Sequence, residues 1–135
     1  MTYAAFTLPA PISTNALWRP TLRKRKDGST FPSKADSGAY KAWIVEAGYH
    51  INLQKPAKIM GPYALTIQVS RACRCDLDNA AKAASDILQR HKIIENDRLA
   101  QKIELTWIAA DKLPPGAGMS VMVVATSAAG IEAFP

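Results

Sequence analysis

The sequence predicts a single small α+β domain in which a mixed β-sheet is flanked by two helices. The 135 residues fit one domain of ordinary size. Some segments alternate apolar and polar residues, whereas two others repeat apolar residues every three or four positions. Hydrophobic residues make up 48% and charged residues 21%, which excludes wholesale disorder and a coiled coil. We therefore expect residues 1–135 to form one packed domain.

The N-terminal part predicts a strand followed by a basic hairpin or loop. Thr2–Leu8 is a short apolar run that ends at a proline, as expected of a strand. Residues 19–34 then carry five Lys or Arg residues within eight positions. The Asp27-Gly28 dipeptide that follows the basic run is a strong turn signal.

The middle of the chain predicts a helix and then a strand. Ser37–Leu53 places apolar and aromatic residues at helical spacing, and Ser37 or Asp36 could cap the helix. Tyr63–Ser70 alternates apolar and polar residues, which indicates a half-buried strand. Because Arg71 fits the apolar face badly, we expect this strand to bulge or end near it.

The last third predicts a helix and two strands. An Ala-rich run with helical period begins at or just after Asp78 and ends at Asn96. Residues 101–110 and 119–127 then resemble strands. The eight-residue loop DKLPPGAG between them could join the two strands as a wide hairpin.

Neither of the two longest uncharged stretches is typical of a membrane span. Residues 1–18 and 113–131 both contain prolines, and neither offers the ~20 consecutive apolar residues that a spanning helix needs. Residues 1–18 also lack the basic leader of a signal peptide. We expect a soluble, cytoplasmic protein without a membrane partner.

The two cysteines are predicted to be reduced thiols. Alternate residues on a strand lie about 6–7 Å apart, so a disulfide between Cys73 and Cys75 would be strained. A zinc site is also disfavoured, because there is no second cysteine pair and His50 and His91 lack ligand spacing.

Two aspartates at the end of the Tyr63–Ser70 strand form a candidate metal site. Asp76 and Asp78 are expected on one face, where two ionised carboxylates repel each other unless a cation neutralises them. Hard oxygen ligands suit Mg²⁺, with Mn²⁺ as the alternative. Lys82 follows Asp78 by one helical turn and could orient a water or neutralise charge on a phosphate.

A third carboxylate, Asp97, follows the second helix and could return towards the first two. The helix is about 18 Å long, so its length alone does not establish that return. Structural roles are the alternative for all these residues. Asp78 could cap the helix, Asp78, Lys82 and Asp86 could form a solvated ladder, and Asp97 could be a turn residue.

The motif DLDNAAKAASDIL, followed by IIENDRL, strongly resembles the RusA family of Holliday-junction resolvases. The signature of that family is D-x-D-N-x-x-K-x-x-x-D with a further aspartate after the helix. The opening of the chain is similar too, with a short strand, a proline-containing turn that includes Asn15, a basic stretch and an aromatic helix around Tyr40. The resemblance spans most of the chain.

This resemblance implies a RusA-like fold, a metal site and a catalytic lysine. Asp76, Asp78 and Asp97 would bind the divalent metal, and Lys82 would be catalytic. Asn79 and Asp86 match the motif without an assigned role. The arginine-rich run that often precedes the first aspartate in the family is interrupted here by RACRC. No organic cofactor is expected.

The basic residues predict a polyanionic partner. The formal net charge is +6, which favours nucleic acid, and counterion release would supply most of the binding free energy. A solvated basic loop is the alternative. The candidate DNA-binding residues are Asn15, Arg19, Arg23, Lys24, Arg25, Lys26, Arg71 and Arg74.

The expected function is Mg²⁺-dependent resolution of Holliday junctions by paired symmetric nicks, in recombination, repair or phage DNA processing. The rivals are a non-catalytic DNA-binding module and a less selective nuclease that cuts flaps or other branched DNA. A four-way junction is approximately two-fold symmetric, so a C2 homodimer is expected. Candidate interface residues are Val121, Val123 and Val124 in the last strand, and the helix bearing Trp43.

Overall fold

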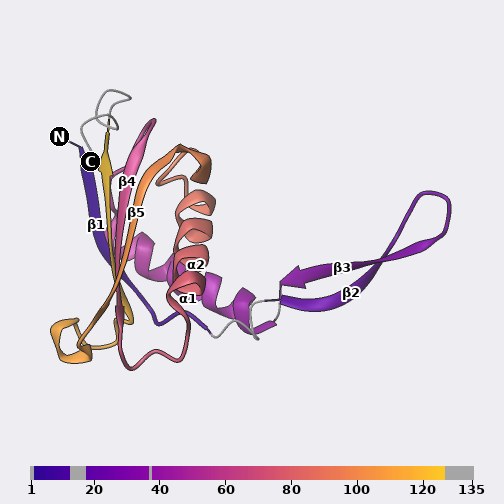
Figure 1. The fold of residues 1–135 in the computed structure, drawn as a ribbon, viewed down its shortest axis with the longest axis horizontal. Helices are drawn as coiled ribbons and strands as arrows, with labels where there is room; N and C mark the ends of the chain where they lie inside the picture. The colour runs from indigo at the N-terminus through magenta and orange to yellow at the C-terminus, as the bar shows by residue number, and fades with distance from the viewer. Residues whose placement is uncertain (1, 13–17, 37, 127–135) are drawn as a thin grey trace.

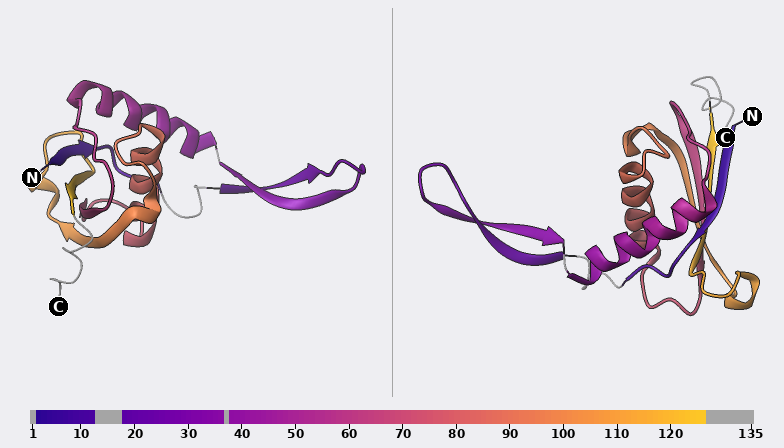
Figure 2. Two further views of the ribbon diagram at one scale, coloured as in Figure 1. Left: turned by 90° about the horizontal axis from the view of Figure 1, so that it is seen from above. Right: turned by 180° about the vertical axis from the view of Figure 1, so that it is seen from behind.

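The computed structural model contains a four-stranded mixed sheet with two helices packed on the same face (Figures 1 and 2). It describes residues 2–12, 18–36 and 38–126, and only the backbone of residues 18–21, 23 and 31–36. The predicted α+β class is confirmed. In sheet order the strands are β1 (Tyr3–Leu8), β6 (Met119–Ala125), β4 (Tyr63–Ser70) and β5 (Ala100–Ile108), and the helices are α1 (Gly38–Gln54) and α2 (Leu77–Arg90).

The core lies between the sheet and the helices. Strand β4 turns alternate residues towards the helices, and Tyr63, Leu65, Ile67 and Val69 are all fully buried, at 0% exposure. Each such aliphatic side chain contributes about 1.5–3 kcal/mol when it leaves water. From the other side the small alanines of α2 allow the helix to approach the sheet closely, and Ile87 and Leu88 fill the core beside them. This packing places α2 alongside β4 and β5 on one face of the sheet (Figure 1).

The connection from β4 through α2 to β5 is a parallel crossover. β4 and β5 pair in parallel, which requires the chain to return along the sheet before β5 begins, and α2 makes that return. Strand β6 pairs antiparallel with both β4 and β1.

The predicted wide hairpin of the last two strands is therefore wrong. β6 lies between β1 and β4, where Met119, Val121 and Val123 are completely buried, whereas β5 occupies the edge. The intervening segment includes a short 3₁₀ turn, η3 (Ala110–Lys112), and carries the chain past the end of β4.

The basic segment forms an antiparallel hairpin of β2 (Trp18–Lys24) and β3 (Thr30–Asp36), separate from the main sheet. Figures 1 and 2 show this hairpin projecting from the body as an arm. At its tip Gly28 has a φ of 91°, a left-handed conformation that favours glycine. The Asp27 carboxylate accepts hydrogen bonds from the backbone N–H and hydroxyl of Ser29, at 2.9 and 2.6 Å, and these bonds lower the pKa of Asp27.

Helix α1 begins at Gly38 and ends at Gln54, whereas the predicted helix runs from Ser37 to Leu53. Its buried positions include Tyr40, Trp43, Ala47 and Ile51, as the apolar spacing predicts. The cap expected at Ser37 lies outside the described residues, and Asp36 is the last residue of β3.

The expected dimer-interface residues need correction. Val121 and Val123 are 0% exposed and Trp43 is 3% exposed, because all three pack in the core of their own chain. Val124, on the opposite face of β6, is half-buried. Within the part of the chain that is described, neither helix has the length and apolar character needed to cross a bilayer.

The buried hydroxyl of Tyr63 predicts a stability effect. Within the described residues, its Oη has no hydrogen-bond partner, and burial, with a smaller effect of Asp97, raises the pKa of Tyr63 to about 12. An unsatisfied buried hydroxyl costs about 1–3 kcal/mol. We expect Tyr63→Phe to leave the free energy of unfolding unchanged or to raise it, as measured by urea denaturation at pH 7.

The same substitution has an expected pH signature. The pKa of Tyr63 is higher in the folded protein than in the unfolded chain, where it has its ordinary value of about 10. The wild-type fold therefore loses stability as the pH rises from about 10 to 12. Tyr63→Phe lacks this titration, so the wild type should lose more stability than the variant over that range. A loss of more than about 1 kcal/mol in the variant at pH 7 would contradict the absence of a partner.

Candidate functional site

The two leading aspartates lie where α2 begins. β4 ends at Ser70, near the predicted position, and Asp76 is the residue that precedes the first turn of α2. Its backbone carbonyl accepts the N–H groups of Asn79 and Ala80 at 3.1 Å, but its carboxylate makes no capping hydrogen bond. Asp78 lies in the first turn, and both side chains are exposed.

This position favours negatively charged side chains, although the Asp76 carboxylate makes no capping hydrogen bond to the helix. The N-terminus of a helix carries a partial positive charge, and acidic side chains such as those of Asp76 and Asp78 are favoured there. The alternative that Asp78 caps the helix is wrong, because the capping position belongs to Asp76. The carboxylate oxygen atoms of Asp76 therefore make no hydrogen bond that caps the helix.

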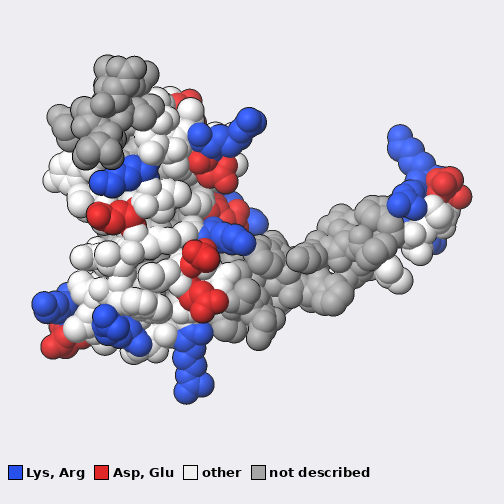
Figure 3. Space-filling view, viewed as in Figure 1, with Lys and Arg blue, Asp and Glu red and all other residues white. Residues whose placement is uncertain are grey.

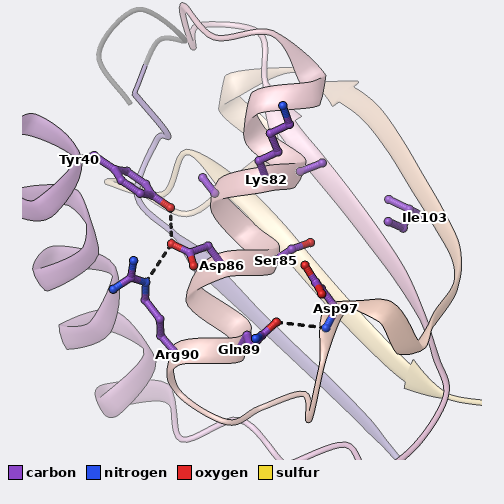
Figure 4. A pocket seen from close by; sticks show the side chains of 10 residues that line it. Tyr40, Lys82, Ser85, Asp86, Gln89, Arg90, Asp97 and Ile103 are labelled. Atoms are coloured by element: carbon purple, nitrogen blue, oxygen red, sulfur yellow. Dashed lines mark hydrogen bonds and ion pairs between the residues drawn. The ribbon is translucent and has the colours of Figure 1, made fainter. Parts of the chain in front are cut away.

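Lys82 and Asp97 line a different part of the surface. Together with Asp86 and Arg90 they border an open pocket of about 520 Å³ beside α2 (Figure 4). Asp97 begins the short turn η2 (Asp97–Leu99), and its N–H donates a 3.1 Å hydrogen bond to Oε1 of Gln89. Asp97 consequently lies near Ser85 and Gln89, beside the later turns of α2 (Figure 4).

The structure does not gather the three predicted metal ligands into one cluster. Across residues 2–12, 18–36 and 38–126, no three His, Cys, Asp or Glu side chains are grouped closely enough to hold an ion. Asp76 and Asp78 are not among the residues that line the pocket of Asp97. From Asp78 to the turn beside Asp97 the helix rises about 10 Å. Lys82 lies between the two carboxylate groups along α2.

Asp86 has a structural contact that the sequence motif does not reveal. Its Oδ2 accepts a 2.5 Å hydrogen bond from Oη of Tyr40 and a 2.9 Å charge-assisted bond from Nε of Arg90 (Figure 4). Tyr40 is buried and stacks on Trp43 with 6.0 Å between ring centroids. Asp86 therefore joins α2 to α1, which is the helix that follows the hairpin. The hydroxyl of a buried tyrosine usually has a hydrogen-bond partner, so the predicted burial of Tyr40 is the sequence signal that could have indicated this bond.

Asn79, the other motif residue without an assigned role, is 5% exposed in the first turn of α2. Its position next to the core, rather than on the solvent face with Asp78, indicates that it contributes to the local structure of the helix start.

The prediction that Cys73 and Cys75 are reduced thiols is confirmed, but the strand geometry expected for them is wrong. A strained disulfide is expected only where Cys73 and Cys75 continue a strand, but β4 ends at Ser70 and the chain then turns. The two Sγ atoms lie 2.6 Å apart, although both residues are free thiols. Burial, with the neighbouring Cys73 thiol, raises the pKa of Cys75.

The basic candidates fall into two groups. Lys24, Arg25 and Lys26 are exposed at the tip of the hairpin, where Figure 3 shows Lys and Arg side chains far from the body. Arg71 and Arg74 are exposed in the turn that leads to Asp76. For the remaining three candidates, the structure describes only the backbone of Arg19 and Arg23, and Asn15 lies outside the described residues.

No protein-family model matches this chain, and no curated protein matches its sequence. The resemblance to RusA proteins therefore rests on the motif around α2 and on the similar opening of the chain.

The Tyr40–Asp86 contact predicts that one hydroxyl matters for stability. Tyr40→Phe keeps the stacked ring but removes a hydrogen bond to a charged acceptor, so we expect a loss of about 1–3 kcal/mol in urea denaturation. Arg90→Ala should cost less, about 0.3–0.5 kcal/mol, because both partners of that ion pair are partly exposed.

Tyr49→Phe is the matched control, because Tyr49 lies on the same helix and is 62% exposed. Equal stabilities of Tyr40→Phe and Tyr49→Phe would show that Asp86 does not hold the helices together.

Proposed function

We propose that this protein is a Mg²⁺-dependent endodeoxyribonuclease that resolves four-way DNA junctions by paired symmetric nicks, acting in the cytoplasm as a homodimer. One observation carries the proposal. Two exposed carboxylates, Asp76 and Asp78, lie at the start of α2 without a capping bond from Asp76, and Lys82 follows one turn later. Carboxylates that can hold a metal ion and a nearby cation that can stabilise charge on a phosphate are groups that metal-assisted phosphodiester hydrolysis uses.

The donor chemistry of the helix start fits Mg²⁺. Asp76 and Asp78 offer hard oxygen atoms on exposed side chains, and Mg²⁺ in proteins usually takes one or two carboxylates, with waters and substrate phosphates completing its coordination. The resemblance to RusA proteins adds Asp97 as a third ligand. The ion would supply a water activated at neutral pH and neutralise charge on the phosphate.

The protein's own residues would bind and orient the scissile phosphate. Lys82 follows Asp78 by one helical turn and lines the same pocket as Asp97, so its ammonium group would attract a phosphate placed against this side of α2. Asp86, through Tyr40, would keep α2 in position relative to α1. Arg71 and Arg74 would hold the DNA backbone beside Asp76.

The projecting hairpin supports a large DNA substrate. Its exposed Lys24, Arg25 and Lys26 lie far from α2, so one DNA molecule that touches both must extend over the length of the arm (Figures 1 and 3). A four-way junction has such an extent. A homodimer would place two candidate sites under the same two-fold symmetry as the junction.

A non-catalytic DNA-binding module is the second candidate. One observation favours it: Asp97 does not share a cluster with Asp76 and Asp78 within the described residues. In that case the hairpin would bind DNA and the carboxylates would have no catalytic role.

Cleavage assays distinguish the two candidates. Labelled four-way junction, linear duplex and single strand are incubated with and without Mg²⁺. We expect cleavage of the junction alone, in opposing strands, only with Mg²⁺. Asp76→Asn, Asp78→Asn and Asp97→Asn should each lower the rate at least a hundredfold yet preserve junction binding, because each removes charge with little change in shape.

Asp111→Asn provides the control, because Asp111 is an exposed aspartate in η3 away from this pocket. Lys82→Ala should slow cleavage much more than it weakens binding. Wild-type rates in all three carboxylate variants would refute the nuclease, and binding without cleavage by the wild type would favour the non-catalytic module.

The hairpin tip predicts a change in salt dependence. Replacing Lys24, Arg25 and Lys26 together by Gln should weaken junction binding and flatten the slope of log K against log salt by up to ~0.9 for each phosphate that the variant no longer neutralises. Fluorescence anisotropy across a salt series measures this slope. A matched triple change of Lys55, Lys58 and Lys112, exposed elsewhere, should have little effect. Equal slopes in both triple variants would place the DNA surface away from the hairpin.

A further inference from the structure

The two cysteine sulfur atoms lie almost within bonding distance. Sγ of Cys73 and Sγ of Cys75 are 2.6 Å apart, and a disulfide bond is about 2.05 Å long. A turn after β4 brings them together, in which the Cys73 N–H donates to the Ser70 carbonyl at 3.0 Å. The two thiols therefore need to approach by only about half an ångström to form a bond.

The two thiols differ in access. Cys75 is 6% exposed and packs in the core. Cys73 is partly exposed and lines an open pocket of about 620 Å³ together with Ser70, Ala72 and Gly118. A small molecule in this pocket would reach Cys73 first, and Cys75 would be the second, shielded thiol.

We propose that Cys73 and Cys75 form a redox modification site, which closes reversibly to an intramolecular disulfide by exchange with a low-molecular-weight disulfide such as oxidised glutathione. The Cys73 thiolate attacks one glutathione sulfur, the glutathione disulfide bond breaks, and one reduced glutathione leaves. The Cys75 sulfur then attacks Cys73, giving up its proton, and displaces the second glutathione. The two cysteines are oxidised by two electrons, and one glutathione disulfide is reduced to two thiols.

The disulfide would change the candidate catalytic segment. Cys75 immediately precedes Asp76, so ring closure constrains the backbone that positions Asp76 and the first turn of α2. Shifts of about 1 Å at a catalytic group can cost a hundredfold in rate. We expect the oxidised protein to cleave junctions at least tenfold more slowly than the reduced protein. This effect on rate depends on the proposed function, whereas formation of the disulfide does not.

Mass spectrometry of the intact chain tests the modification itself. The purified wild type is incubated with excess oxidised glutathione and quenched with acid. The expected product is a monomeric chain that is lighter by two hydrogen atoms and returns to the starting mass with dithiothreitol. A chain that stays fully reduced, stops with glutathione attached, or forms only disulfides between chains would overturn the proposal.

Single-cysteine variants test the order of the two steps. Cys75→Ser should accumulate one glutathione on Cys73, because the second thiol is missing. Cys73→Ser should react at least tenfold more slowly, because Cys75 is buried. If serine unfolds the buried site, Cys75→Ala provides the same test. Equal rates of glutathione attachment in the two variants would contradict the assigned order.

Cleavage rates then separate this inference from the proposed function. The double variant Cys73→Ser/Cys75→Ser should cut equally with and without oxidised glutathione, whereas the wild type should lose activity and regain it with dithiothreitol. A wild type that forms the disulfide but cuts at an unchanged rate would refute the regulatory role. A reduced wild type that never cuts would refute the nuclease, whereas the mass measurement would still decide the modification.

Discussion

The packing of α2 against the buried face of β4 determines where the candidate functional residues lie. β4 and β5 run parallel, so the helix between them must travel back along the sheet. The turn after β4, with Asp76, and the turn before β5, with Asp97, consequently lie at opposite ends of α2. The same packing keeps Ala80, Ala84 and Ile87 buried and leaves Asp78 and Lys82 on the solvent side.

This geometry gives the motif residues different tasks. Asp76 and Asp78 face solvent at the positive end of a helix, where charge is tolerated without a cap. Asp86 is engaged by Tyr40 and Arg90, which makes it an anchor between the helices rather than a free ligand. The cysteine turn lies just before the first carboxylate. Metal binding, helix packing and thiol chemistry would therefore converge on one stretch of chain.

Local patterns predicted most elements but not how distant elements pair. The alternation in Tyr63–Ser70 and the apolar spacing around Trp43 depend on neighbouring residues, and both elements form as predicted. The position of β6 between β1 and β4 depends on which apolar faces meet in the core, which no local period reports.

The site shows the same limit of sequence reasoning. The sequence placed Asp76 and Asp78 together, because they are two residues apart. It could not place the Tyr40–Asp86 bond, which spans 46 residues, or the Cys73–Cys75 contact, which depends on where β4 ends.

The central question is whether Asp97 binds the same metal ion as Asp76 and Asp78. Titration of Mn²⁺ by electron paramagnetic resonance, with junction DNA and the slow-cutting Lys82→Ala protein, answers it. The account predicts saturable binding that weakens at least tenfold in each of Asp76→Asn, Asp78→Asn and Asp97→Asn, but not in Asp111→Asn. Binding that is unaffected by Asp97→Asn would contradict a shared three-carboxylate site, and binding that is unaffected by all three substitutions would contradict the metal site itself.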